Sequence, residues 1–230
     1  MPAVAVVIPT LDEEKALPSC LASVGEGADE LVVSDGGSRD DTIEIVHAHP
    51  TARLVTGRAG RGAQLNAGAD ATSSPILLFV HADCRLQAEW RPALEEALTD
   101  REVSLASFHL HTEPAPGTRS TWLNRAWLRF VDLRSYGAGL PYGDQGFGVR
   151  RELFERLGGF PAIPLMEDYA FARACRREGR IAHLDPPIRT TARRFQRHPV
   201  RTRLMTATFP LLFRLGISPW RLASWYRAVR

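Results

Sequence analysis

Cysteine is scarce in this chain of 230 residues, and no long uncharged apolar run occurs in it. Cys20, Cys84 and Cys175 lie far apart without a Cys-x-x-Cys pair, which excludes a disulfide framework and a cysteine zinc site. No run reaches transmembrane length without a charge or a proline. The apolar stretch Met1–Pro9 is short and uncharged, so we expect a first strand there rather than a signal peptide. These absences predict a cytoplasmic location.

Acidic residues are absent beyond Asp185, whereas arginines continue to the last residue. Such a tail suggests phosphate groups, an anionic membrane surface or nucleic acid as partner. We expect the tail to be helical, with breaks at Pro210 and Pro219. Its apolar side chains have two interpretations: they lie on an anionic membrane, at the inner face of the plasma membrane, or they cover a sheet edge. These side chains are Leu211, Leu212, Phe213, Leu215, Trp220, Trp225 and Tyr226.

Short apolar runs alternate with helical patterns over the first 80-odd residues, which predicts a mostly parallel sheet flanked by helices. The predicted strands are Val4–Ile8, Glu30–Asp35, Arg53–Thr56 and Ile76–Val80. The second half is less regular, and no linker or repeat divides the chain. There we expect strands at Val103–His111 (half-exposed), Gly146–Val149 and Ile181–Leu184, and helices at Trp90–Leu98, Thr121–Arg134, Glu152–Leu157 and Tyr169–Glu178.

Polar residues follow three of the predicted strands, at Pro9-Thr10, at Asp35 and at His81-Ala82-Asp83. The carboxyl ends of parallel strands share one edge of a sheet, where ligands bind in such folds. An aspartate at a strand end also turns the chain for purely structural reasons. Thr10 with Glu13 has the spacing of a helix capping box, and Ser38 with Asp41 resembles another cap. Three polar ends on one edge favour a site.

The glycine-rich stretch Gly57–Gly62 is neither a Walker loop nor a dinucleotide fingerprint. Arg58 and Arg61 nevertheless flank its glycines at a helix start, where backbone N–H groups favour a phosphate. Glu167 and Asp168 open a later helix, where the helix dipole stabilises carboxylates whether or not they are functional.

Several motifs occur in the order and spacing typical of family 2 glycosyltransferases, and together they cover almost the whole chain. They are Val6–Glu14, Leu31–Asp40, Gly57–Gly68, Leu78–Asp83, Gly143–Gln145, Gly158–Pro161, Met166–Asp168 and Ala192–His198. Within that family the sequence resembles the short bacterial branch of arsenosugar-biosynthesis-type glycosyltransferases. The resemblance implies a type A glycosyltransferase fold, as a single Rossmann-like domain over 1–230. Residues 1–84 would form its nucleotide-binding half, 85–198 the acceptor and catalytic half, and 199–230 basic amphipathic helices.

The activity implied is transfer of a hexose from a nucleotide-diphosphate sugar, most often a UDP-sugar, to an acceptor hydroxyl with inversion. Asp168 corresponds to the general base, and Asp35 to the group that accepts a hydrogen bond from the nucleobase. The implied donor-binding residues are Pro9, Thr10, Glu13, Asp35, Gly36, Arg61, Asn66, Gly68, Ala82 and Asp83. Asp144, Gln145 and Glu167 would contact the acceptor or support the site from behind.

The resemblance also implies Mg²⁺ or Mn²⁺ on the donor diphosphate, held by Asp83 and by His198 as a further ligand. His81 stands where the family usually has the first acid of its Asp-x-Asp motif. Because imidazole is a poorer ligand for Mg²⁺ than carboxylate, two alternatives stay open: Asp83 and the phosphates alone hold the metal, or the reaction requires the metal only weakly.

Two other classes compete with sugar transfer. A nucleotidyltransferase on a related sheet would carry a glycine- and arginine-rich loop directly after its first strand, where this chain has Pro9–Asp12. A non-catalytic module that binds membrane or nucleic acid through the arginine tail would leave the strand-end carboxylates unexplained. We therefore expect an enzyme with no nucleic-acid partner and an acceptor that is either free or lipid-linked.

Overall fold

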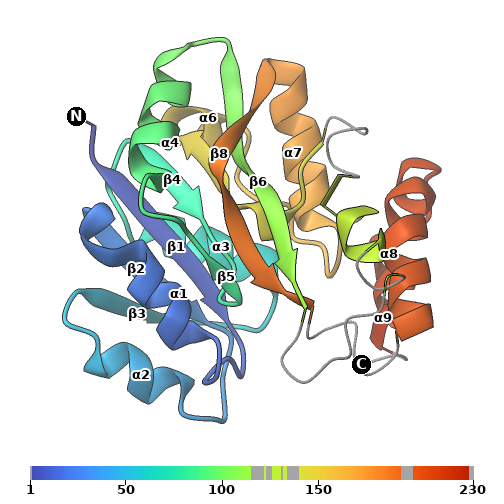
Figure 1. Ribbon diagram of the computed structural model, residues 1–230, viewed down its shortest axis with the longest axis horizontal. Coiled ribbons are helices and arrows are strands. Elements are labelled where there is room, and N and C mark those ends of the chain that lie inside the picture. The colour runs from blue at the N-terminus through green and yellow to red at the C-terminus, as the bar shows by residue number, and fades with distance from the viewer. Residues whose placement is uncertain are drawn as a thin grey trace.

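The computed structural model describes residues 2–114, 122, 126–130, 132–133, 140–192 and 199–227. Its centre is an eight-stranded sheet in the order β3-β2-β1-β4-β7-β6-β8-β5. Helices lie on both faces of this sheet (Figure 1). The predicted α/β class, a mostly parallel sheet flanked by helices, is confirmed.

The first four strands form the parallel part of the sheet, as the sequence predicts. They are β1 (Val4–Thr10), β2 (Glu30–Asp35), β3 (Ala52–Thr56) and β4 (Ile76–Phe79). β1 lies between β2 and β4 and is parallel to both. The chain thus builds outward from β1 to one side through β2 and β3, and to the other side through β4. Ligands bind at such a switch point in open α/β sheets.

The remaining strands depart further from the predictions. β7 (Phe147–Arg150) runs antiparallel to β4, and β6 (Val103–Glu113) joins β7 to β8 (Arg180–Thr191). The short β5 (Cys84–Arg85) pairs with β8 and forms the edge of the sheet. The strand predicted at Val103–His111 is confirmed, but the prediction that it is half-exposed was wrong for its first six residues, which are buried on both faces of the sheet. β8 also continues well past Leu184, the end expected for it.

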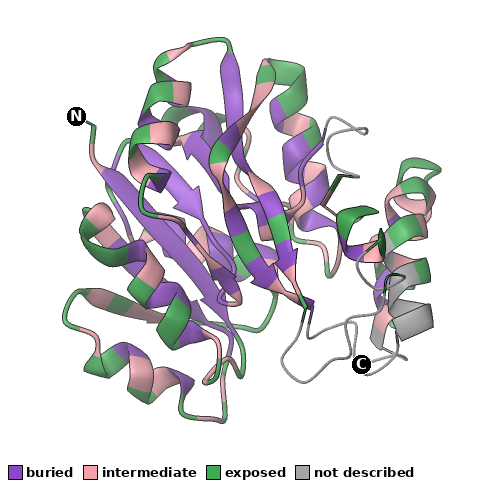
Figure 2. Cartoon of the chain, viewed as in Figure 1, coloured by how far each residue is buried: buried purple, intermediate pink, exposed green. Residues whose placement is uncertain are grey.

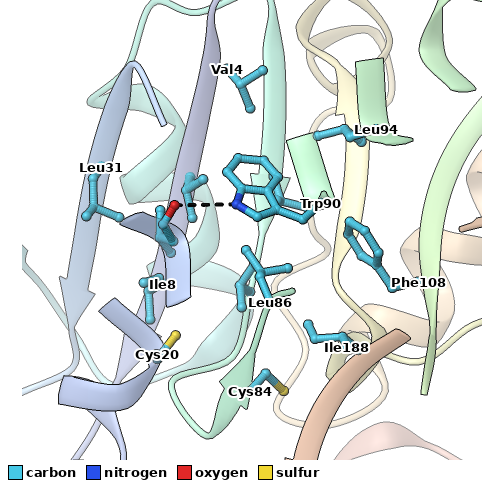
Figure 3. Packing of buried hydrophobic residues seen from close by; sticks show 14 of the residues in the cluster. Val4, Ile8, Cys20, Leu31, Cys84, Leu86, Trp90, Leu94, Phe108 and Ile188 are labelled. Atoms are coloured by element: carbon cyan, nitrogen blue, oxygen red, sulfur yellow. Dashed lines mark hydrogen bonds between the residues drawn. The ribbon is translucent and has the colours of Figure 1, made fainter. Parts of the chain in front are cut away.

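One face of the sheet is covered by α1 (Leu17–Val24) and α4 (Trp90–Thr99), and α2 (Thr42–Ala48) lies beside α1. Figure 3 shows this apolar cluster, in which Trp90 is surrounded by the side chains of both helices and of β1. The indole Nε1 of Trp90 donates a hydrogen bond to the carbonyl oxygen of Val24 at 3.4 Å. This hydrogen bond offsets the cost of burying the polar N–H group of the indole.

The opposite face is covered by α3 (Arg61–Asp70), α6 (Arg151–Arg156) and α7 (Glu167–Glu178). Its core includes a group of interlocking rings, Phe79, Phe154, Phe160 and Phe171, with the Phe160 and Phe171 centroids 4.4 Å apart. This packing fixes the loop before α7 against the end of β4. The two loops that carry predicted site residues therefore rest on one rigid core.

The C-terminal helices α8 (Pro199–Arg214) and α9 (Pro219–Arg227) stand together at the end of the molecule opposite β3 (Figure 1). The predicted break at Pro219 coincides with the start of α9, but α8 continues through Pro210. Phe209 and Leu222 pack into the second core, whereas other apolar residues of these helices are exposed, as the green segments of Figure 2 show. None of the described helices has the length and apolar character needed to cross a bilayer.

Gly68 brings α3 close to the sheet, and this contact gives a stability prediction. A Cβ at Gly68 would lie 2.3 Å from Cγ1 of Val7. Because backbone elements would have to separate, Gly68→Ala is expected to lower the free energy of unfolding by about 1–3 kcal/mol. The melting temperature should then fall by about 2–10 °C. Gly57→Ala is the matched control, since nothing lies within 4 Å of its Cβ position, and it should leave the melting temperature unchanged. Equal melting temperatures for both variants would contradict this packing role.

Candidate active site

A cavity of about 480 Å³ opens at the carboxyl ends of β1 and β4, at the switch point of the sheet. Pro9 and Thr10 from β1 line it, together with His81 and Ala82 from the segment after β4. The start of α3, the loop before α7 and one side of α9 complete the wall. The lining residues from these segments are Leu11, Glu13, Ala59, Gly60, Arg61, Gln64, Pro164, Leu165, Ala223 and Tyr226.

A hydrogen-bond network around Asp35 forms the floor of this cavity. Oδ1 of Asp35 accepts from the hydroxyl groups of Thr10 (3.0 Å) and Ser38 (2.5 Å). Oδ2 accepts from the backbone N–H groups of Gly37 and Ser38, both at 2.8 Å. Burial by itself would raise the pKa of Asp35, but these hydrogen bonds outweigh it and hold the pKa below its usual value. The carboxylate is therefore ionised and has no exposed surface.

This network also explains why both predicted helix caps were wrong. β1 extends to Thr10, so the Thr10 hydroxyl donates to Asp35 and does not cap a helix. α1 begins only at Leu17, and its first residue has no side-chain cap. α2 begins at Thr42 after Asp41, again without a side-chain cap. Ser38 instead donates to Asp35, so two residues predicted as caps hold the strand ends together.

Gln64 ties α3 to the same strand ends. Its Nε2 donates to the carbonyl oxygens of Thr10 (2.7 Å) and Ser34 (2.9 Å), and its Oε1 accepts from the N–H of Gly60 (3.3 Å). A Cβ at Gly36 would lie 3.0 Å from the Gln64 amide, so a larger residue there would require Gln64 to shift. Gly36, predicted to bind the donor, thus makes room for Gln64.

Arg61 and Glu167 form an ion pair at one wall of the cavity, between Nε of Arg61 and Oε1 of Glu167. The Glu167 side chain is 1% exposed and that of Arg61 is 31% exposed. Burial, together with the neighbouring charge of Asp168, raises the pKa of Glu167 despite the attraction of Arg61. Burial would lower the pKa of Arg61, but the two carboxylates outweigh this and raise it. The guanidinium is therefore a fixed positive charge beside the cavity.

Asp168 lies in the first turn of α7, directly behind this ion pair. Its Oδ1 accepts from its neighbour Tyr169 N–H at 2.7 Å and its Oδ2 from Gly143 N–H at 3.0 Å. Burial alone would raise the pKa of Asp168; the charge of Arg61 and these two N–H groups lower it instead. A carboxylate held ionised in this way can accept a proton at neutral pH.

The backbone just before α7 is strained. Met166 has φ 69° and ψ 17°, a left-handed conformation that a residue other than glycine rarely adopts. Its side chain is buried, so the surrounding core maintains this conformation. The resulting turn presents Glu167 and Asp168 together toward Arg61. Such strain concentrates at functional sites.

His81 links Asp168 to the end of β4. A Cβ at Gly143 would lie 2.8 Å from Nε2 of His81 and 3.1 Å from Oδ2 of Asp168, so both side chains border one small space. Asp83 follows two residues later and lies near the Cys84 thiol, with Sγ to Oδ1 at 3.8 Å. Asp35, Asp83 and Asp168 do not line the cavity themselves, but each lies next to a residue that does: Thr10 donates to Asp35, Ala82 precedes Asp83, and His81 borders the same space as Asp168.

The predicted donor-binding residues divide into two groups. Pro9, Thr10, Glu13, Arg61 and Ala82 line the cavity. The others are not among its lining residues: Asp35, Gly36, Asn66, Gly68 and Asp83. For example, Nδ2 of Asn66 donates to the carbonyl oxygen of Phe160 at 2.9 Å, and Oδ1 of Asn66 accepts from the backbone N–H of Phe160 at 2.8 Å.

The residues predicted to contact the acceptor differ in burial and in their hydrogen-bond partners. Gln145 is buried and donates to the carbonyl oxygen of Phe108 at 3.0 Å, so it holds the Gly143–Gln145 turn. Asp144 lies in the same turn, beside the space shared by His81 and Asp168, and is partly exposed. His198, predicted as a metal ligand, lies outside the described residues.

Some lining residues were missed by the sequence analysis. Gln64 belongs to a recognised motif, and its position one turn into a helix after glycines was a usable signal. Pro164 and Leu165 precede Met166 in another motif. Ala223 and Tyr226 had no local signal, because their position depends on how α9 packs against the domain.

A divalent cation fits this site in a limited way. No three His, Cys, Asp or Glu side chains in the described part of the chain gather as metal ligands. Mg²⁺ and Mn²⁺ are, however, commonly held by one or two carboxylates together with substrate phosphates and water. Asp83 supplies one such carboxylate, so the donor set is compatible with a cation that binds mainly through the donor.

Solved structures share this fold, and two of them are complexes with nucleotide sugars. A mannosyltransferase from Pyrobaculum calidifontis, in complex with GDP-Man and Mn²⁺, is 24% identical, with a TM-score of 0.64 over 96% of this chain and 68% of that chain. A structure of S. aureus TarS in complex with UDP-GlcNAc is 17% identical, with a TM-score of 0.63 over 91% of this chain and 66% of that chain. The fold is therefore that of type A glycosyltransferases.

The comparison of sequences identifies the family to which the chain belongs. Residues 5–158 match the family described as Glycosyl transferase family 2, and the chain belongs to it. An uncharacterized glycosyltransferase of Mycobacterium bovis, Mb0553, is 35% identical over 123 residues, which are 54% of this chain and 55% of that protein. The aligned part is thus about half the length of this relative. Family membership decides against the nucleotidyltransferase and the non-catalytic module, while the narrower arsenosugar resemblance stays a prediction.

Proposed function

We propose that the protein transfers a hexose from a nucleotide-diphosphate sugar, with a UDP-sugar as first candidate, to an acceptor hydroxyl with inversion. The observation that carries the proposal is the cavity at the switch point of the sheet, whose lining residues Thr10, Ala82 and His81 lie next to Asp35, Asp83 and Asp168. Its volume of about 480 Å³ at the end of β1 suits a nucleoside, and Arg61 provides a fixed positive charge for the diphosphate. The nucleotide sugars bound by TarS and by the Pyrobaculum enzyme support a donor of this class.

In this proposal each residue has a role that follows from its position in the cavity. Pro9, Thr10 and Glu13 contact the nucleoside, and Arg61 stabilises charge on the departing diphosphate. Asp168 takes the proton of the acceptor hydroxyl as it attacks from the side opposite the leaving group. A divalent cation, when bound at Asp83, supplies further positive charge to the diphosphate.

The Asp35 network changes how the nucleobase can be recognised. A carboxylate has about four acceptor positions, and Thr10, Gly37 and Ser38 already fill them. A nucleobase N–H can reach Asp35 only if one of these donors yields. We propose that Asp35 acts on the base mainly by fixing Thr10 at the cavity surface.

The acceptor and catalytic half, residues 85–198, contributes Asp144, the Gly143–Gln145 turn and the start of α7 to the space facing Asp168. An acceptor hydroxyl is proposed to enter there, beside His81. The exposed apolar and basic side chains of α8 and α9 favour a lipid-linked acceptor over a free one.

Donor binding is the direct test of the proposal. A matching nucleotide sugar at about 100 times its Kd should raise the melting temperature by about 5–10 °C. UDP-Glc, UDP-GlcNAc and GDP-Man are compared, each with Mn²⁺ and with EDTA. In Asp83→Asn we expect the Mn²⁺-dependent part of the shift to be lost, whereas Asp70→Asn, an exposed carboxylate on α3, should keep it. The absence of a shift with any nucleotide sugar would remove the proposed donor class.

A further inference from the structure

The helices α8 and α9 each have two different faces. Phe209 of α8 and Leu222 of α9 are buried in the second core. On the other side of α8, Leu204, Leu211 and Leu215 are 62%, 57% and 72% exposed, and their spacing places them on one stripe of the helix. In α9, Trp220 and Trp225 are 59% and 43% exposed. These helices are thus fixed to the domain by one side and show large apolar side chains on the other.

The same segment carries only positive charge. Arg214 and Arg221 are exposed, and no ion pair of either residue is found among the described residues. No acidic residue occurs in the sequence beyond Asp185. Exposed leucine and tryptophan beside unpaired arginine characterises helices that lie in the interface of an anionic bilayer.

We propose that the outer side of α8 and α9 docks on an anionic phospholipid surface. We name this side the tail face and define it by Leu204, Leu211, Arg214, Leu215, Trp220, Arg221 and Trp225. Nucleic acid fits this surface less well, because most of its area is aliphatic or aromatic and offers phosphates only two described guanidinium groups. A second copy of the chain is disfavoured because arginines would face arginines across a symmetric contact.

α9 connects the tail face to the active site. Its inner residues Ala223 and Tyr226 line the cavity, as does Arg61. Docking through Trp220 and Trp225 would therefore place one wall of the cavity at the lipid headgroups. This step rests on the proposed function. The acceptor hydroxyl then belongs to a lipid-linked molecule that reaches Asp168 from the bilayer surface.

Vesicle flotation tests the docking without donor or acceptor. We expect the protein to float with phosphatidylcholine vesicles that contain about 30% phosphatidylglycerol, and not with phosphatidylcholine alone. Raising the salt from about 50 mM to about 500 mM should release most of it. Trp220→Ser with Trp225→Ser should weaken binding more than about tenfold. Arg214→Gln with Arg221→Gln should weaken it roughly 10- to 30-fold.

The matched control is Arg176→Gln with Arg177→Gln, which removes the same charge from exposed positions on α7 and should bind like the unchanged protein. No binding to anionic vesicles at low salt overturns the proposal, as does equal binding by the tryptophan variant. A concentration-dependent dimer that the tryptophan variant abolishes, without vesicle binding, would assign the tail face to a second copy. Because flotation needs no catalysis, its result stands apart from the donor-binding test, which all these variants should pass.

Discussion

Replacing Asp168 by asparagine should reduce kcat for sugar transfer by about 10²–10⁴-fold, the usual contribution of a general base. The asparagine side chain still accepts one of the two hydrogen bonds, from Gly143 or from Tyr169, so the start of α7 should keep its place. The nucleotide-sugar shift in melting temperature should therefore persist. Measurement of kcat and of donor-induced shifts on the same preparation separates loss of the base from loss of the fold. Full activity in Asp168→Asn would remove Asp168 from the base role.

The pH dependence of transfer provides a second measure of the same residue. Arg61 and two N–H groups hold the pKa of Asp168 below its usual value. The base therefore stays ionised from neutral pH down through the ordinary titration range of aspartic acid, near pH 4, and activity should fall only as the pH passes below it. Asp70→Asn, the exposed control, should retain the unchanged profile.

Arg61→Met should lower the free energy of unfolding by about 3 kcal/mol at neutral pH, with a fall in melting temperature of about 6–12 °C. The reason is that Glu167, which is 1% exposed, would remain buried without its partner. We place the cost at the lower end for broken buried pairs because the Arg61 side chain is 31% exposed. Urea denaturation of the variant and of the unchanged protein measures the difference.

The stability cost of Arg61→Met should depend on pH in a defined direction. Burial raises the pKa of Glu167, so its ionisation opposes folding and stability is lost as the pH rises through the folded-state pKa. Asp168 has the opposite shift, and it contributes stability that is lost as the pH falls. Removing Arg61 raises both pKa values, so the cost should be largest at neutral pH and shrink below about pH 4.

The double variant Arg61→Met with Glu167→Gln is the control for this interpretation. Replacing the buried carboxylate by a neutral amide removes the uncompensated charge, so the pair should recover much of the stability lost in Arg61→Met. Strictly additive losses in the two single variants would show that Arg61 and Glu167 do not act as a pair. Donor binding should stay weak in the double variant, because Arg61 lines the cavity.

Much of the sheet could be predicted from the sequence, because buried parallel strands read as apolar runs. β2 was predicted with its observed bounds, and β4 to within one residue. β8 was underestimated, since Pro186 and Pro187 argued for an end that the strand does not have. α8 continues through Pro210, which single-sequence rules treat as a break. In both places tertiary packing overrides the local preference of proline.

The motifs in the sequence placed Thr10 and His81 at strand ends and Asp168 at the start of a helix, and the structure has these residues there. What the sequence did not reveal was which of these residues face the cavity. Asp35 and Asn66 are polar residues of such motifs, yet their polar atoms are bound to other parts of the protein. The partners of Asn66 and one partner of Asp35, Thr10, lie far away in the sequence, and spacing alone contains no information about them. The wall formed by α9 was hidden for the same reason.

The network of Thr10, Asp35 and Gln64 is complete without a ligand, and this has a consequence for affinity. The order of the two strand ends and of α3 is established when the chain folds. A donor that enters the cavity meets side chains that are already ordered. Binding therefore does not carry the entropic cost of ordering them. Differences in affinity among nucleotide sugars should then arise from the surrounding walls, at Leu165 and Tyr226, where the contacts come from later segments of the chain.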